Sequence, residues 1–257
     1  MSNFNLAGRV VIITGGGTGI GKIYSQAFAK AGAKIVIADI AGPEGNSAAA
    51  KIVQSGGDAI AITTDISDET KTLAMAEATL KAYGRIDVLV NNASLMSTLE
   101  RKAWHKIDIE EWDRVMAVNL RGMFLCCRAV YEQMKKQESG KIINISSSRF
   151  WSGAPFRLHY STSKAGVIGF TRSLSREVGA DNINVNAITP GFTESETQLA
   201  TSTPEYLANS GDRYKKRAFK RAQVPDDLVG TVMFLASDAS DFMTGQTINV
   251  DGGENMH

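Results

Sequence analysis

The sequence predicts an α/β fold, a doubly wound parallel sheet with helices on both faces. Its 257 residues, 43% hydrophobic and 21% charged, are typical of a globular protein. Seven short runs rich in valine and isoleucine alternate with longer helical stretches. Because the runs are apolar on both faces, they are expected to be parallel strands that helices cover on each side. The predicted strands are 9–14, 34–38, 58–63, 86–90, 141–145, 184–188 and 246–250.

The stretches between these strands are long enough for the crossover helices that parallel strands require. No linker, low-complexity tract or internal repeat divides the chain, so residues 1–257 are predicted to form a single domain. The expected helices are 20–31, 43–55, 68–82, 109–137 and 161–179.

The alternation lapses between residues 194 and 224, which we interpret as a helical flap inserted before the last crossover. This flap carries a cluster of basic residues in an otherwise neutral chain. A solvated helix face is the simpler interpretation, and contact with an acidic substrate or an anionic surface is the alternative. The cluster consists of Arg213, Lys215, Lys216, Arg217, Lys220 and Arg221.

Composition argues against several classes of partner. With 28 Lys+Arg against 27 Asp+Glu the net charge is +1, so nucleic acid is not expected as a partner. No apolar stretch approaches the roughly 18 residues of a membrane span, and the first residues lack a signal-peptide pattern, so a cytoplasmic location is expected. Cys126 and Cys127 are adjacent, which suits neither an ordinary disulfide nor a zinc site, and no metal is predicted.

A glycine-rich turn, TGGGTGIG at 14–21, joins the first strand to the first helix. Glycines there allow a sharp turn and let a pyrophosphate lie close to the unpaired N–H groups of the helix. Asp39 ends the next strand, at about the separation expected for the residue that binds an adenosine ribose. The pattern therefore predicts a dinucleotide site.

Asp39 also bears on which dinucleotide is used. Two like charges about 4 Å apart at an effective dielectric near 20 repel by roughly 4 kcal/mol, which disfavours a ribose 2′-phosphate. Neither Thr18 nor Ile40 supplies a compensating cation, so NAD is expected in preference to NADP. The alternative is an ordinary aspartate that caps a turn at the end of a strand.

Tyr160 and Lys164 are four residues apart, so in a helical conformation their side chains meet on one face. A phenol titrates near pH 10, and lowering its pKa to about 7 takes roughly 4 kcal/mol of phenolate stabilisation. A neighbouring ammonium together with a nicotinamide cation can supply it. This spacing is frequent on helix surfaces, so alone it indicates little.

Together the motifs resemble those of the short-chain dehydrogenase/reductase family over essentially the whole chain. The resemblance implies a Rossmann-type domain with a seven-stranded parallel sheet, a helical substrate flap, and a homotetramer. The matching elements are TGGGTGIG, Asp65 after the third strand, NNA at 91–93, Asn119, Ser147 in INISS, YSTSK at 160–164, PG at 190–191 and GQTINVDGG at 245–253.

The resemblance also implies roles. Tyr160 would be the acid/base and Lys164 would lower its pKa and hold the nicotinamide ribose. Ser147, between Ser146 and Ser148, would orient the substrate oxygen, and Asn119 would hold a water that relays protons. Cofactor contacts are implied for Gly15, Thr18 and Ile20 at the pyrophosphate, Asp39 at the ribose, Asp65 and Ile66 at the adenine, Asn92 and Ala93 along the groove, and Pro190, Gly191 and Thr193 at the nicotinamide.

The chain departs from the family pattern at Ser94, at Gln223 and in the segment after Ser147. The implied substrate pocket includes Arg149, Phe150, Trp151 and Arg157. Aromatic side chains there favour a cyclic or aromatic substrate, or they pack the flap instead. The two arginines leave a carboxylate-bearing substrate open. His159, about 100° from Tyr160 on the helix, is expected to pack or to be exposed rather than to act in catalysis, and His257 is expected to reach across a subunit interface.

These features predict an NAD-dependent oxidoreductase that interconverts a secondary alcohol and a ketone by hydride transfer. A 3-oxoacyl or other carbonyl reductase carries the same motifs, and a sugar or hydroxy-acid dehydrogenase is a further alternative. A non-catalytic NAD-binding protein is disfavoured, because such a protein has no need of Asn119, Ser147, Tyr160 and Lys164 together.

Overall fold

All seven predicted strands form, and they pair in parallel in one sheet of order β3-β2-β1-β4-β5-β6-β7. The computed structural model describes residues 4–202 and 211–256. The strands are β1 (Val10–Thr14), β2 (Lys34–Asp39), β3 (Asp58–Thr63), β4 (Val88–Asn91), β5 (Gly140–Ile145), β6 (Ile183–Pro190) and β7 (Thr247–Val250).

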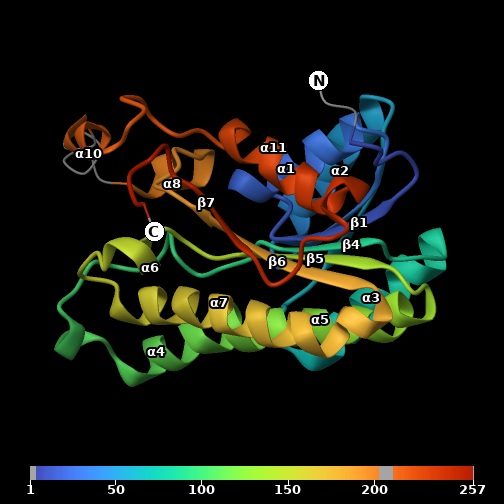
Figure 1. Cartoon of the computed structure of the whole chain (residues 1–257), viewed down its shortest axis with the longest axis horizontal. Helices are drawn as coiled ribbons and strands as arrows, with labels where there is room; N and C mark the ends of the chain where they lie inside the picture. Colours follow the sequence, from blue (N-terminus) through green and yellow to red (C-terminus); the bar gives the residue numbers. More distant parts are fainter. Residues whose placement is uncertain (1–3, 203–210, 257) are drawn as a thin grey trace.

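Helices cover both faces, which confirms the doubly wound fold. Figure 1 shows α1, α2 and α11 on one face, and α3, α5 and α7 on the other. No helix in the described ranges is both long and apolar enough to cross a membrane. The α-helices are α1 (Gly19–Lys30), α2 (Gly42–Gln54), α3 (Glu69–Tyr83), α4 (Ile109–Met116), α5 (Met123–Lys136), α6 (Arg149–Ser152), α7 (Leu158–Val178), α8 (Glu196–Thr201), α10 (Gly211–Lys216) and α11 (Asp226–Ala236).

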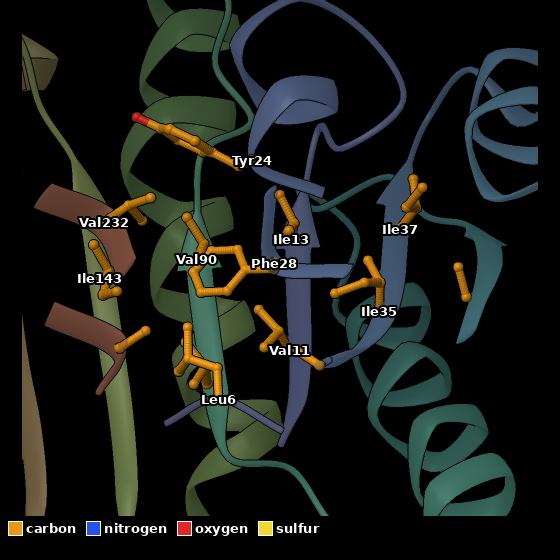
Figure 2. Close-up of a cluster of buried hydrophobic side chains, with 14 of the residues drawn as sticks. Leu6, Val11, Ile13, Tyr24, Phe28, Ile35, Ile37, Val90, Ile143 and Val232 are labelled. Carbon is orange, nitrogen blue, oxygen red and sulfur yellow. The ribbon is translucent and has the colours of Figure 1, made fainter. Parts of the chain in front are cut away.

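Alternation along the strands supplies two separate cores. Val11 and Ile13 of β1 pack with α1 and α11 on one face (Figure 2), whereas Val10 and Ile12 pack toward α3 and α5 on the other. Such two-sided burial explains why these strands are apolar on both faces.

The predicted helix at 109–137 is wrong in one respect, since it is not continuous. A π-helical segment, Ala117–Gly122, separates α4 from α5 and contains the buried Asn119. Widened turns of this kind occur frequently at functional sites. Local periodicity did not distinguish this segment from the α-helix on either side.

Cys126 and Cys127 are free thiols buried in the second core, on α5. Burial raises the pKa of Cys127 to about 12, which keeps this thiol protonated at neutral pH. Both cysteines are therefore small residues of the core.

Tyr24 of α1 gives a test of this packing. Its ring is fully buried, and no hydrogen-bond partner for its hydroxyl lies within the described part of the chain. Because the hydroxyl is desolvated without compensation, Tyr24→Phe should leave the free energy of unfolding unchanged or raise it. Tyr24→Ala, which leaves a cavity, should lower it by about 3–5 kcal/mol. Urea denaturation measures both, and a loss above about 1 kcal/mol for Tyr24→Phe contradicts the assignment.

Candidate active site

The predicted site residues gather at the carboxyl ends of the strands. Parallel strands bring these ends to one edge of the sheet, and the chain order reverses between β1 and β4. A ligand crevice is expected at such a reversal. The glycine turn follows β1, Asn92 follows β4, Ser147 follows β5, and Gly191 follows β6.

The glycine turn has the backbone shape that its sequence predicts. Gly15 and Gly19 adopt positive φ values of 62° and 53°. A Cβ on Gly21 would lie 2.0 Å from the carbonyl oxygen of Gly15, so only glycine fits there. Thr18, the N-cap of α1, makes no side-chain cap hydrogen bond among the described residues. The first-turn N–H groups of α1 therefore keep their capacity to bind an anion.

Asp39 is almost buried and holds this turn in place. Its carboxylate accepts hydrogen bonds from the backbone N–H groups of Gly17, at 2.9 Å, and Ala41, at 3.0 Å. The alternative interpretation, an aspartate that caps a turn, is therefore realised. It does not exclude a ribose contact, since each carboxylate oxygen can accept further hydrogen bonds.

Of the two residues expected at the adenine, Asp65 is half-buried and Ile66 is buried. Asp65 accepts hydrogen bonds from the backbone N–H and the hydroxyl of Ser67, at 2.9 and 2.7 Å. Ile66 is only 6% exposed and belongs to the core beneath α3 and α5. Its side chain therefore packs mainly inward, which sequence reasoning did not anticipate.

Asn92 ties the two strands at the reversal point together. Its side-chain amide donates to the carbonyl oxygens of Thr14, at 3.0 Å, and Gly15, at 3.2 Å. The Thr14 hydroxyl in turn accepts from the backbone N–H groups of Asn92 and Ala93. These contacts set the separation of the β1 and β4 loops.

Helix α7 carries Tyr160 and Lys164, which are 6% and 3% exposed. The Lys164 ammonium lies 5.7 Å from the centroid of the Tyr160 ring and donates to the carbonyl oxygen of Ile145, at 2.8 Å. Burial lowers the pKa of Lys164 to about 7, because desolvation disfavours its charged form. This side chain is thus poised to change charge near neutral pH.

Burial raises the pKa of Tyr160 above its usual value near 10. A hydrogen bond with Ser147 opposes this effect, as do the positive charges of Arg149 and Arg157. The lowering that sequence reasoning expected from Lys164 is therefore not found in the protein alone. The reason is that desolvation of a phenolate outweighs these interactions.

Of the three consecutive serines, Ser147 is the one that contacts Tyr160. The Ser146 hydroxyl donates instead to the carbonyl oxygen of Lys164, at 2.7 Å. The backbone N–H of Ser148 donates to Pro190, at 2.9 Å, and so joins the turns that follow β5 and β6.

Asn119 links the loop after β4 to α7. Its side-chain oxygen accepts from the backbone N–H of Leu95, at 2.8 Å, and its amide donates to the Ser163 hydroxyl, at 3.0 Å. Because both ends of this amide are engaged, Asn119 fixes the loop beside Tyr160.

A buried polar chain that sequence reasoning missed positions α7 on the sheet. Asn91 donates to Asn144 at 2.9 Å, and Asn144 donates to the hydroxyl of Thr171 at 3.0 Å. These residues come from β4, β5 and α7. The signal was present, since asparagine is unusual inside strands as apolar as these.

Comparison with known proteins settles the family. A family model described as enoyl-(acyl carrier protein) reductase matches residues 15–255. A probable galactose dehydrogenase of Rhizobium meliloti is 40% identical over 251 residues, covering 97% of this chain and 96% of that protein. A 3-oxoacyl-[acyl-carrier-protein] reductase of Synechocystis is 38% identical, covering 96% and 97%. The chain belongs to the short-chain dehydrogenase/reductase family.

Solved structures of this family have the same fold. A candidate short-chain alcohol dehydrogenase of Sinorhizobium meliloti has a TM-score of 0.90 at 32% identity, with 98% of each chain covered. A candidate NAD(P)-dependent gluconate 5-dehydrogenase of Beutenbergia cavernae, with NADP bound, has a TM-score of 0.88 at 33% identity, with 98% and 99% covered. This short-chain dehydrogenase/reductase is accordingly an NAD(P)-dependent oxidoreductase.

The two arginines of the implied substrate pocket, Arg149 and Arg157, donate hydrogen bonds to backbone carbonyl oxygens. Arg149 donates to the carbonyl oxygens of Ala154 and Pro155, at 2.7 and 2.8 Å, and Arg157 donates to that of Leu99, at 2.9 Å. These bonds shape the loops that flank Tyr160, so the structure weakens the alternative of a carboxylate-bearing substrate.

The aromatic residues of the pocket segment pack on one another. Phe150 and Trp151 make an edge-to-face pair with ring centroids 4.6 Å apart, and the Trp151 indole N–H donates to the Thr189 hydroxyl, at 3.3 Å. His159 is fully buried and pairs with Glu111, at 2.9 Å, so of the two expected placements, packed or exposed, the structure shows the packed one. His257 lies outside the described residues.

The flap reaches the glycine turn. Its helix α8 lies against α1, since a Cβ on Gly19 would be 2.9 Å from the Thr197 hydroxyl, and Lys22 pairs with Glu196, at 2.9 Å. Thr193, before α8, forms a bridge with Gln223, at the far end of the flap. The predicted flap of 194–224 is described except for residues 203–210, and α8 and α10 are its described helices.

The interpretation of the flap's basic cluster as a solvated face is wrong for Arg217, whereas Lys215, Lys216, Lys220 and Arg221 are exposed. Arg217 is 1% exposed, because its guanidinium pairs with Glu254, at 3.0 Å. Arg221 pairs with Asp227, at 2.6 Å, and Lys220 donates to the carbonyl oxygen of Lys215. The side chain of Arg213 lies outside the described part. Nothing local marked Arg217 as buried, since its partner is 37 residues away.

Because the pKa of Lys164 is lowered, we expect this residue to make the stability of the protein depend on pH. The pKa of Lys164 is about 7 in the folded protein and 10.5 in the unfolded chain. Between these two pH values the unfolded state therefore binds more protons than the folded state. The stability of the wild type relative to Lys164→Met should therefore rise as the pH increases from 7 toward 10. Urea denaturation across this range measures the difference, with Lys71→Met at an exposed site of α3 as control. A flat difference contradicts desolvation of Lys164.

Proposed function

We propose that this protein is an NAD-dependent dehydrogenase/reductase that interconverts a secondary alcohol and a ketone. The observation that carries the proposal is the joint burial of Tyr160, Ser147 and Lys164 at the carboxyl end of β5. A phenol hydrogen-bonded to a serine, with an ammonium nearby, can exchange a proton with a substrate oxygen.

The glycine turn fits a dinucleotide. Bulkier residues would clash within the turn, and the uncapped start of α1 suits a pyrophosphate. A bound nicotinamide accepts or supplies the hydride, and its positive charge in the oxidised form favours the phenolate. The residues that would hold the cofactor are Gly15, Thr18, Ile20, Asp39, Asp65, Ile66, Asn92, Ala93, Lys164, Pro190, Gly191 and Thr193.

In the direction of oxidation, the Tyr160 phenolate takes the proton from the substrate hydroxyl as hydride leaves the same carbon. Reduction reverses both transfers. Ser147 donates a hydrogen bond to the substrate oxygen and so aligns it with the phenol. Lys164, with its pKa near 7, would supply a proton relay beside the ribose, and the second lone pair of the Asn119 side-chain oxygen would accept from the water that connects this relay to solvent.

The preference for NAD rests on Asp39. Its carboxylate is held by two backbone N–H groups at the end of β2, and the next side chain, Ile40, is 68% exposed and uncharged. A 2′-phosphate placed beside this carboxylate would be repelled by it, and Ile40 supplies no compensating charge.

The substrate that we propose is neutral and cyclic or aromatic. Phe150 and Trp151 offer an apolar wall, and the bonds of Arg149 and Arg157 to backbone carbonyls disfavour a carboxylate ligand. A sugar or a 3-oxoacyl thioester is the second candidate, since the similar proteins from Rhizobium meliloti and Synechocystis carry those names. We also propose a homotetramer, and the fully exposed Phe242 is apolar surface that subunit contact would cover.

Tyr160→Phe tests the acid/base assignment. Because the variant keeps the ring but loses the exchangeable proton, it should bind NADH as the wild type does and lose at least about 100-fold in kcat. NADH fluorescence measures binding, and absorbance at 340 nm with a panel of secondary alcohols, aryl alcohols, sugars and hydroxy acids measures turnover. Tyr131→Phe, a remote phenol that bonds Asp181, is the control. Activity above a few per cent in Tyr160→Phe would remove this residue from the role.

Asp39→Asn tests cofactor choice. Removal of the charge should lower the ratio of kcat/KM with NAD to kcat/KM with NADP by at least about tenfold. Asp65→Asn is the control, because the adenine is common to both cofactors and the ratio should stay constant. An unchanged ratio in Asp39→Asn would mean that another residue sets the preference.

A further inference from the structure

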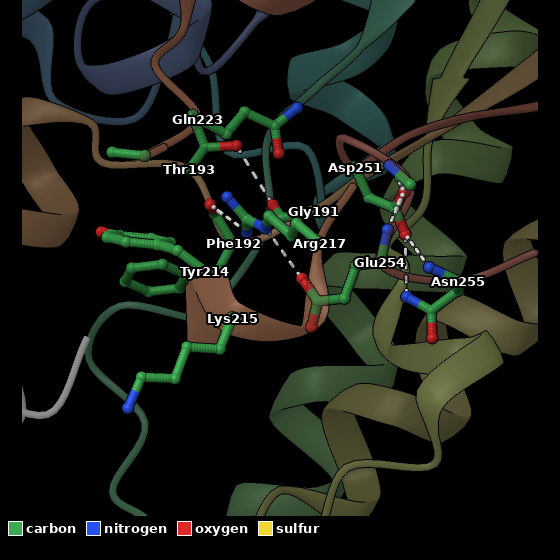
Figure 3. Close-up of polar contacts among 12 residues, drawn as sticks. Gly191, Phe192, Thr193, Tyr214, Lys215, Arg217, Gln223, Asp251, Glu254 and Asn255 are labelled. Carbon is green, nitrogen blue, oxygen red and sulfur yellow. Dashed lines mark hydrogen bonds and ion pairs between the residues drawn. The ribbon is translucent and has the colours of Figure 1, made fainter. Parts of the chain in front are cut away.

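Arg217 is a fully buried arginine that no step of the proposed reaction uses. Its Nε donates to Glu254, at 3.0 Å, and its Nη2 donates to the carbonyl oxygen of Phe192, at 2.9 Å. Its guanidinium carbon lies 5.5 Å from the centroid of the Tyr214 ring. As Figure 3 shows, one side chain thereby joins the flap, the turn after β6 and the segment after β7.

The turn held by Arg217 is the part of the site expected to meet the nicotinamide. Gly191 donates its backbone N–H to the carbonyl oxygen of Val250, at 2.9 Å. Gln223 packs over the same glycine, since a Cβ on Gly191 would lie 2.6 Å from the Gln223 side-chain oxygen. The Gln223 amide donates to Val250 as well, at 2.7 Å. Turn 190–193 is therefore fixed from the sheet, from the end of the flap and by Arg217.

Glu254 is itself held rigidly. The Asp251 carboxylate accepts hydrogen bonds from the backbone N–H groups of Gly253, Glu254 and Asn255, at 3.0, 3.1 and 2.9 Å. These bonds wind the segment after β7 into a compact turn that presents Glu254 to Arg217. Through the Arg217–Glu254 pair, the position of the segment after β7 thus fixes the position of the carbonyl oxygen of Phe192.

We propose that Arg217 and Glu254 are positioning residues that hold turn 190–193 in the shape required by the nicotinamide end of the cofactor. A guanidinium carries separate nitrogen donors in fixed directions and can bond two acceptors at once, whereas a lysine has one nitrogen and cannot occupy both donor positions. The proposal rests on the proposed function, because it assumes that a nicotinamide cofactor binds at this edge of the sheet.

The test compares the binding of NADH with that of ADP-ribose, which lacks the nicotinamide. Kd values for both ligands are measured by calorimetry on the full chain, for the wild type, Arg217→Lys and Glu254→Gln. Arg221→Lys is the matched control, because Arg221 belongs to the same flap and pairs with Asp227 through an exposed guanidinium. Thermal unfolding of each variant verifies that it is folded.

Arg217→Lys should weaken NADH binding about tenfold and leave ADP-ribose binding within twofold, because only the nicotinamide end loses its support. Glu254→Gln, which keeps an acceptor but not the charge, should weaken NADH binding about threefold and provides the measurement if Arg217→Lys does not fold. Arg221→Lys should change neither Kd.

Equal effects on the two ligands, or no effect on either, would overturn the positioning role while leaving the proposed function intact. A wild-type protein that binds neither NADH nor ADP-ribose would overturn the proposed function itself, and this proposal with it.

Discussion

The hydrogen bonds between Asn92 and the backbone of Thr14 and Gly15 are the contact on which the site depends. They lie at the one place where the strand order reverses, so no crossover helix passes between the loops that follow β1 and β4. The segments that follow the other five strands end at the same edge of the sheet, so the separation of these two loops sets the width of the site between them. The glycines permit that separation, and the Asn92 amide maintains it.

Burial affects the pKa values of the two proposed catalytic residues more than their mutual charge does. Tyr160 and Lys164 are both desolvated, and desolvation moves their pKa values in opposite directions, raising that of the phenol and lowering that of the ammonium. Both groups are thereby biased toward their neutral forms. A cationic cofactor ring would favour the phenolate and would in this way couple proton transfer to the presence of the oxidised cofactor.

Many polar side chains near the candidate site contact the backbone and hold loops in place. Arg149, Arg157 and Arg217 each donate to backbone carbonyl oxygens, so their first effect is to shape loops. The Asn91–Asn144–Thr171 chain has the same effect on α7. Charge near a pocket is therefore weak evidence for a charged substrate until the partners of each side chain are known.

The sequence by itself determined the strands, the glycine turn and the pairing of Tyr160 with Lys164, because each depends on periodicity or spacing within about 20 residues. It also indicated Asp39 and Ser147 through their positions at strand ends. Only the tertiary structure decided that Arg217 is buried, that helix 109–137 is interrupted, and that Ser147 rather than Ser146 contacts the phenol. Those outcomes depend on partners distant in the chain, such as Glu254 for Arg217, and the energy of a buried charge is set by the partner that it meets.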